Sequence, residues 1–133
     1  MTQSRRAVIA GVGAAACTTL LATNLSAQIP TMITGRKIIY DVAGYRIRMK
    51  FISETQVRWT YLAAPTPAQV GKTSTETCDR IDLRSELILM AWTETDKTHV
   101  FDIFDFANNI VFANFVWPDG TRAKSQVSFV REA

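Results

Sequence analysis

Alternation of apolar and polar residues dominates the chain from Gly35 onward. In the segment 45–51 apolar residues alternate with arginine and lysine, and the segments 57–61 and 122–129 repeat this period of two. Such a period is typical of β-strands with one buried face and one solvated face. The pattern therefore predicts three strands whose inward-facing residues include Ile47, Met49, Phe51, Trp59 and Val127.

Apolar runs at 38–42, 87–92, 100–106 and 110–116 predict further strands, and no helical stretch of comparable length is found. Turn-favouring residues separate the runs, which gives about eight strands joined by short connections. Short connections favour an antiparallel meander, and closing it into a barrel removes the exposed edges. We therefore expect an all-β fold, a small antiparallel closed β-barrel just wide enough for one small ligand, with a two-sheet sandwich as the alternative. The irregular segment 63–72 is predicted to lie at the barrel mouth.

Residues 1–27 have the organisation of an export signal. Ser4-Arg5-Arg6 precedes a short apolar run, and a small residue, Ala27, ends the segment. The paired arginines resemble a twin-arginine signal peptide. We expect cleavage after Ala27, leaving 28–133 as a single domain that is periplasmic or secreted and has no membrane association. Lipoprotein processing at Cys17 is the alternative.

Cleavage changes the charge and cysteine content of the chain. The 15 basic residues fall to 13 against 12 acidic ones, so the formal net charge falls from +3 to +1. With basic and acidic residues nearly balanced, the sequence has no excess of positive charge for binding nucleic acid, and no nucleic-acid partner is expected. Cys78 remains alone, which excludes an intrachain disulfide. With Arg80 as its nearest basic neighbour, Cys78 is predicted to be an inert thiol.

Few residues offer catalytic or metal-binding chemistry. His99 is the one histidine of the sequence, which excludes a histidine-rich metal site, and we expect it at the surface. Asp102 and Asp105 are an odd number of residues apart, so a strand would place them on opposite faces. The sequence therefore predicts no metal site and no cofactor.

Glu94 is the strongest candidate for a general acid. It follows Trp92 on the same face of an apolar strand and precedes a predicted turn. A partly desolvated carboxyl at a barrel rim would have a raised pKa, as a general acid requires. The alternative is an ordinary solvated glutamate at the end of a strand.

Three segments resemble two related families. Residues 89–95 and 98–104 resemble the central strands of phenolic acid decarboxylases and of MoaF-like (molybdenum cofactor biosynthesis protein F-like) proteins, and 35–40 resembles their first strand. Residues 105–120 are more similar to the MoaF-like branch. The resemblance implies a lipocalin-like barrel whose interior is the ligand site.

The resemblance to the decarboxylases also implies roles for individual residues. Glu94 matches the proton-donating glutamate of these cofactor-free enzymes, and Tyr40 matches the first of two tyrosines that position the substrate carboxylate. Val42 occupies the position of the second tyrosine, and Lys72 that of an arginine. Because lysine cannot reproduce the bidentate fork of arginine, the sequence does not predict decarboxylation of phenolic acids.

These observations predict an exported barrel that binds a small apolar or aromatic molecule. The residues expected to contact the ligand are Tyr45, Trp59, Tyr61, Lys72 and Trp92. A first alternative is a cofactor-independent lyase or isomerase in which Glu94 acts as acid and base, with its carboxylate within hydrogen-bonding range of Tyr40 or of a shared water. A second alternative is a solid barrel that serves for interaction or homodimerisation.

Overall fold

The computed structural model describes residues 32–133, which form nine strands and one short 3-10 helix. The predicted signal peptide, its cleavage site and Cys17 lie outside the described residues. The elements are β1 (Lys37–Val42), β2 (Tyr45–Phe51), β3 (Gln56–Ala63), η1 (Pro67–Gln69), β4 (Thr73–Thr77), β5 (Asp79–Arg84), β6 (Leu87–Thr93), β7 (His99–Asp105), β8 (Ile110–Val116) and β9 (Arg122–Glu132). Within the described residues, no helix is long and apolar enough to cross a membrane.

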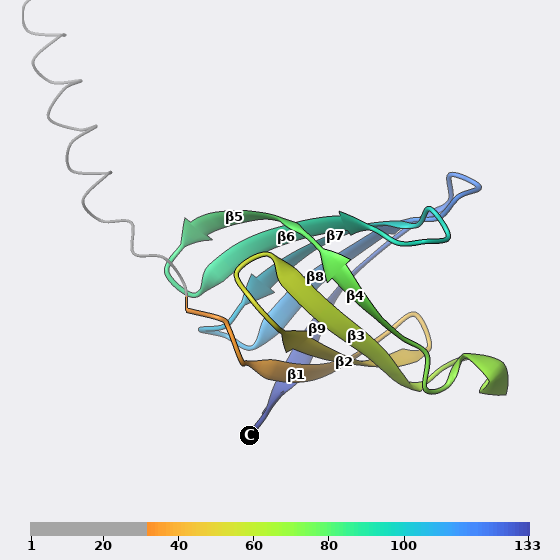
Figure 1. Ribbon diagram of the computed structural model, residues 1–133, viewed down its shortest axis with the longest axis horizontal. Coiled ribbons are helices and arrows are strands. Elements are labelled where there is room, and N and C mark those ends of the chain that lie inside the picture. Colours follow the sequence, from red (N-terminus) through yellow and green to blue (C-terminus); the bar gives the residue numbers. More distant parts are fainter. Residues whose placement is uncertain (1–31) are drawn as a thin grey trace, which may run out of the picture.

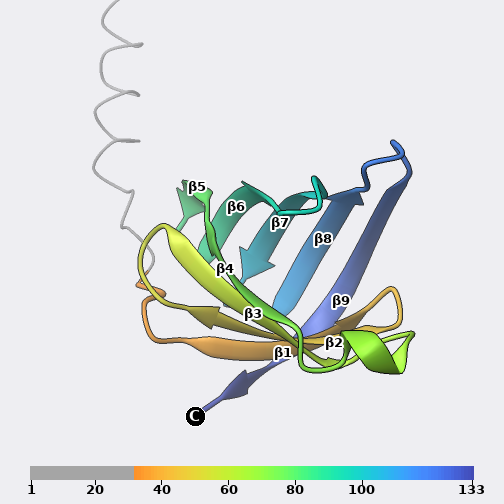
Figure 2. The same ribbon diagram turned by 45° about the vertical axis from the view of Figure 1, so that its right-hand side comes forward.

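All nine strands belong to one antiparallel sheet in the order β4-β3-β2-β1-β9-β8-β7-β6-β5. The sheet curls so that its first and last strands approach each other, which gives a nearly closed barrel (Figures 1 and 2). β4 and β5 end the sheet and follow each other in the chain on either side of Cys78. The predicted fold class is confirmed.

The structure has nine strands where about eight were expected. The seven patterned segments all form strands, and β4 and β5 come from a polar part of the sequence. The burial pattern shows one buried residue in β4, Glu76, and none in β5. Strands at the ends of a sheet need fewer apolar residues, so apolar alternation does not reveal them. They form because each pairs with a strongly apolar neighbour, β3 or β6.

The inward faces predicted by alternation are confirmed. Ile47, Met49 and Phe51 are buried, and Trp59 and Val127 pack against the same core. Four phenylalanines fill one end of the barrel, with Phe51 at 5.2 Å from Phe104 and 5.5 Å from Phe106, and Phe106 at 5.6 Å from Phe129. This end of the interior is solid.

The opposite end of the barrel is its mouth, formed by the connections β1–β2, β3–β4, β6–β7 and β8–β9. Ala43 and Gly44 turn the first hairpin with φ of 51° and 83°, the left-handed backbone of a two-residue type I′ turn. A Cβ on Gly44 would lie 3.2 Å from Cγ of Pro65, so this turn packs tightly against the 63–72 segment. The predicted position of that segment at the mouth is confirmed.

Candidate ligand-binding site at the barrel mouth

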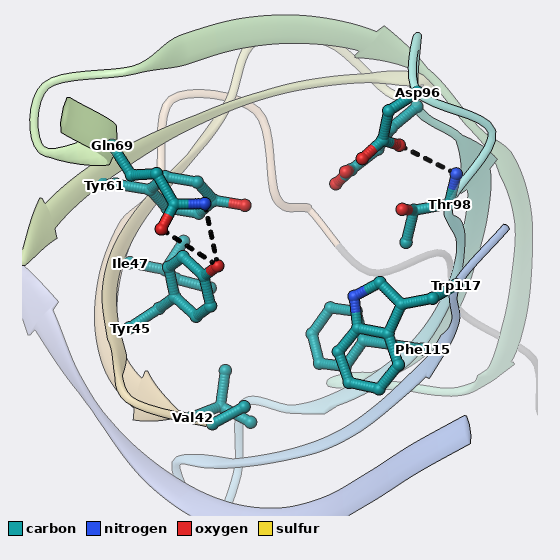
Figure 3. Close-up of a pocket in the computed structure, with 11 residues that line it drawn as sticks. Val42, Tyr45, Ile47, Tyr61, Gln69, Asp96, Thr98, Phe115 and Trp117 are labelled. Atoms are coloured by element: carbon teal, nitrogen blue, oxygen red, sulfur yellow. Dashed lines mark hydrogen bonds between the residues drawn. The ribbon is translucent and has the colours of Figure 1, made fainter. Parts of the chain in front are cut away.

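A pocket of about 90 Å³ opens at the mouth between two aromatic walls (Figure 3). Tyr45 and Tyr61 form one wall, with ring centroids 4.6 Å apart, and Phe115 and Trp117 form the facing wall, with centroids 6.1 Å apart. Tyr45, Tyr61 and Phe115 continue the inward parity of their strands, since core residues precede or follow them at intervals of two. Trp117 follows the end of β8, two residues after Phe115. Val42 and Ile47 also line the pocket.

A slot of about 310 Å³ adjoins the pocket on the side of β3 and β4. Trp59 extends the aromatic wall along it, with its ring centroid 4.6 Å from that of Tyr61. Lys72 lines the slot, and so does Glu76, whose Oε1 accepts a hydrogen bond from the Trp59 indole nitrogen at 3.1 Å. The pocket and slot share four lining residues, Tyr61, Gln69, Glu94 and Asp96.

Gln69 of η1 connects the 63–72 loop to the aromatic wall of the pocket through hydrogen bonds. Its Nε2 donates to the Tyr45 hydroxyl at 3.0 Å, and its Oε1 accepts from the Thr66 hydroxyl at 3.0 Å (Figure 3 shows the bond to Tyr45). The bonds hold the 63–72 segment beside the opening and fix the orientation of the Tyr45 ring. The loop is therefore part of the site.

Glu94 and Asp96 form the third side of the pocket, in the connection between β6 and β7. Backbone hydrogen bonds from Glu94 N to Thr98 O at 2.8 Å and from Lys97 N to Glu94 O at 2.9 Å hold this turn. Asp96 accepts from the Thr98 backbone N at 2.8 Å. Glu94 and Asp96 both line the pocket, and Figure 3 shows the Asp96 carboxylate bonded to the Thr98 backbone N.

The pKa of Glu94 is raised to about 7, first by burial and then by the nearby charges of Asp96 and Glu76, while the Trp92 indole lowers it. Lys72 is not among the groups that shift the pKa of Glu94. A carboxyl with this pKa is divided between its acid and base forms near neutral pH. The raised pKa expected from the sequence is thus present.

Below the pocket lies a buried polar layer. Asp102 is fully buried, and its pKa is raised to about 8, chiefly by burial and against the lowering effect of the Asn114 backbone N and the Tyr40 hydroxyl. The pKa of Tyr40 is raised well above its usual value by burial and then by Asp102. Oδ2 of Asp102 and Nε1 of Trp92 are the buried side-chain polar atoms in residues 32–133 that lack a partner of good hydrogen-bonding geometry.

The residues singled out in the sequence divide between the lining and this layer. Glu94 and the predicted ligand-contacting residues Tyr45, Trp59, Tyr61 and Lys72 line the pocket or the slot. Tyr40 and Trp92 are buried and contribute to neither lining. The charge of Glu94 contributes to the raised pKa of Tyr40, but no direct hydrogen bond joins them among the described residues.

Sequence reasoning missed several residues of the site. The spacing of Asp102 and Asp105 bears only on a shared metal site, whereas the position of Asp102 between Val100 and Phe104 on the inward face of β7 marks it as a buried acid. The two aspartates do face apart, since Asp105 accepts a hydrogen bond from the side-chain nitrogen of Asn108 at 2.8 Å. The pocket also contains Gln69, Asp96, Phe115 and Trp117, and the slot contains Glu76. Phe115 lies near the end of β8 and Trp117 directly follows that strand, while Asp96 lies in the turn after β6, Gln69 in η1 and Glu76 in the polar β4.

The remaining candidates for chemistry lie outside the site. Burial raises the pKa of the Cys78 thiol to about 12, which keeps it protonated and supports its interpretation as inert. His99 is exposed and hydrogen-bonds the Thr93 hydroxyl through Nδ1 at 2.8 Å. Within residues 32–133, no three of the side chains that commonly ligate metals are grouped to hold an ion.

Comparison with known proteins places this barrel among similar folds. A family model described as MoaF-like matches residues 34–129. A solved structure from Burkholderia vietnamiensis, described as a candidate beta-lactamase, is similar with a TM-score of 0.67 and 17% identity, covering 79% of this chain and 98% of that one. At this identity the likeness shows the fold alone. No curated protein matches the chain.

Proposed function

This chain belongs to the MoaF-like family, and we propose that its barrel binds a small molecule with an apolar or aromatic part at the mouth. The observation that supports the proposal is the contrast between the two ends of the interior. Phenylalanines such as Phe51 and Phe104 fill one end, whereas the other end is hollow and walled by aromatic rings. Ligand sites have this character, because they are concave, mostly apolar and supplied with a few placed polar groups.

Each wall would make a different contribution to binding. The rings of Tyr45 and Tyr61 offer flat apolar surface to the ligand, and Trp117 encloses it from the facing side. Gln69 and Glu94 supply the polar groups that would orient the ligand. The hydrogen bond that fixes Gln69 on Tyr45 leaves the wall pre-formed, so little ordering would be needed on binding.

A thermal-shift screen with two matched variants tests this function. A ligand that binds the native protein raises its melting temperature, and we expect hits among small molecules with an aromatic or branched apolar part. Trp117→Ala removes one wall and should abolish the shifts. Phe101→Ala removes an exposed ring from the outer face of β7 and should preserve them. Hits that persist in Trp117→Ala, or a diverse library without hits, would refute binding at the mouth.

A second candidate function is acid–base catalysis by a cofactor-independent lyase or isomerase. It is favoured by the pKa of Glu94, since a group with a pKa of about 7 can both give and accept a proton near neutral pH. Tyr40 lies below the lining, so in this proposal it would act through a bridging group such as a water. Glu94→Gln separates the two functions, because an enzyme would still bind its substrate but lose turnover.

A third candidate, homodimerisation, is favoured by the outer face of the sheet. Ladder pairing aligns Ile81, Leu89, Ile103 and Phe112 in one row across β5, β6, β7 and β8. Ile81 is 57% exposed, and the row contains no charged residue. In a homodimer, the apolar rows of the two copies would pack against each other, and each row would be shielded from water. Light scattering of Ile103→Lys tests this, because a dimer through this face should become monomeric while the mouth is unchanged.

A further inference from the structure

The lining of the mouth has an unequal distribution of charge. Glu94 and Asp96 line the pocket, which has no basic residue in its described lining. Glu76 adds a third carboxyl in the slot, where Lys72 is the basic residue of the described lining. Asp96 and Glu76 each raise the pKa of Glu94, which shows that these carboxylates share one negative field. A carboxylate ligand would enter this field against repulsion, whereas a cation would be attracted.

The aromatic rings add to this preference. A cation within about 6 Å of a ring centroid is attracted to the negative face of the ring, most strongly over tryptophan. Tyr45 and Tyr61 stand on one side of the pocket with Phe115 and Trp117 on the other (Figure 3), and Glu94 and Asp96 belong to the same lining. Several aromatic faces around one small volume form the kind of cage that recognises quaternary ammonium groups.

The size of the pocket limits what part of a ligand it can hold. Its volume of about 90 Å³ is below the roughly 150 Å³ of an engineered cavity that holds benzene. The pocket therefore has room for one compact part of a ligand, such as a branched head group or a single small ring. The adjoining slot of about 310 Å³ has room for the rest of such a molecule.

We propose that the mouth binds small organic cations, with an ammonium or methylated ammonium head in the pocket and the remainder of the molecule in the slot. Glu94 and Asp96 act as counter-ions, and the rings of Tyr45, Tyr61 and Trp117 surround the head. The inference rests on the small-molecule binding proposed above and names the chemical class of the ligand. It also explains why a half-buried carboxyl, that of Glu94, is kept beside aromatic rings, since a bound cation compensates its charge.

Choline and its neutral isostere 3,3-dimethyl-1-butanol form the central test, with 4-hydroxybenzoate as the anionic probe. Binding is measured by NMR titration of the purified full chain at pH 8, where Glu94 is mostly ionised. We expect choline to perturb resonances of the mouth and to bind about tenfold more tightly than the isostere, a difference typical of a cation–π and ion-pair contribution. 4-Hydroxybenzoate should not bind.

Three variants identify the origin of the preference. Glu94→Gln keeps the shape of the site and should weaken choline about tenfold while leaving the neutral isostere unchanged. Asp96→Asn should also weaken choline binding and leave the isostere unchanged. Agreement between the two variants would show that the effect comes from the lost charge and not from a folding defect in one of them. Glu132→Gln is the matched control, because Glu132 pairs with Lys37 at the opposite end of β1 and should affect neither probe.

The outcomes separate the class of ligand from the binding function itself. If the isostere or 4-hydroxybenzoate binds at the mouth as tightly as choline, the cation proposal is wrong and small-molecule binding stands. The cation proposal also fails if Glu94→Gln and Asp96→Asn fold normally and bind choline as the native protein does. If neither the three probes nor a wider fragment set perturbs the mouth, both proposals fail.

Discussion

Tyr40 of β1 and Asp102 of β7 meet inside the barrel although β9 and β8 separate their strands in the sheet. Both side chains are buried, Asp102 completely. Their contact is possible because the sheet curls far enough to bring opposite walls together. It places a carboxyl in the interior below the mouth, where burial and not ion pairing controls its titration.

The buried carboxyl of Asp102 should make stability depend on pH. Its pKa is about 8 in the folded chain, against about 4 for an ordinary aspartate. Between these values the folded state holds a proton that the unfolded state releases, so the free energy of unfolding falls as pH rises from about 4 to 8. Asp102→Asn removes this dependence. We expect the variant to match the native protein at pH 4 and to exceed its stability at pH 8 by an amount on the order of 5 kcal/mol, since each unit of pKa shift corresponds to about 1.4 kcal/mol.

Urea denaturation at a series of pH values measures this difference. The control is Asp105→Asn, because hydrogen bonds from Asn108 lower the pKa of Asp105. A lowered pKa gives the opposite sign, so this variant should lose stability relative to the native protein above about pH 4. A parallel pH profile for Asp102→Asn and the native protein would contradict the buried state of Asp102.

The titration of Glu94 should respond to Asp96. The pKa of Glu94 is about 7, and after burial the charge of Asp96 is the largest cause of the shift. Asp96→Asn removes that charge, so the pKa of Glu94 should fall while staying above that of a free glutamate. Carbon-detected NMR of the glutamate side chains follows the change directly. Glu132→Gln should leave the Glu94 titration unmoved, and an equal response to both variants would show that the shift has another origin.

The phenylalanine-filled end should dominate the stability of the barrel. Phe104 is fully buried and packs edge-on against Phe51, whereas Phe101 lies on the outer face of the same strand and is 45% exposed. Phe104→Ala should reduce the free energy of unfolding by about 3–5 kcal/mol, because it leaves a cavity in the core. Phe101→Ala should cost about 1 kcal/mol or less. Chemical denaturation of the pair measures both, and similar losses would show that the two faces of β7 are not distinguished by burial.

Export remains a prediction from the residues that precede the described barrel. Twin-arginine transport requires both arginines, so changing Arg5 and Arg6 to lysines should block translocation while leaving the folded domain intact. Cell fractionation of a producing bacterium measures the distribution. A doubly substituted protein that is still fully periplasmic would argue against this route. Loss of lipid labelling in a Cys17→Ser variant would instead support lipoprotein processing.

The sequence by itself determined the strands that have one wet face and one buried face. Alternation marks Ile47, Met49 and Phe51 as core residues because a strand places every second side chain on the same side, whatever its partners are. Turn residues such as Ala43 and Gly44 located the hairpins, since few residue types tolerate left-handed backbone. The same parity argument placed Glu94 on the face of Trp92 and predicted its raised pKa.

Only the tertiary structure decided what these faces meet. β4 and β5 are polar strands at the ends of the sheet, where pairing with a neighbour rather than apolar patterning fixes the conformation. Trp117 faces Tyr45 across the pocket because the sheet curls into a barrel, and the curl is a property of all nine strands together. Asp102 becomes a buried acid for the same reason. The local sequence pattern determines the face of a strand on which a side chain lies. The closure of the sheet determines which side chains from other strands it contacts.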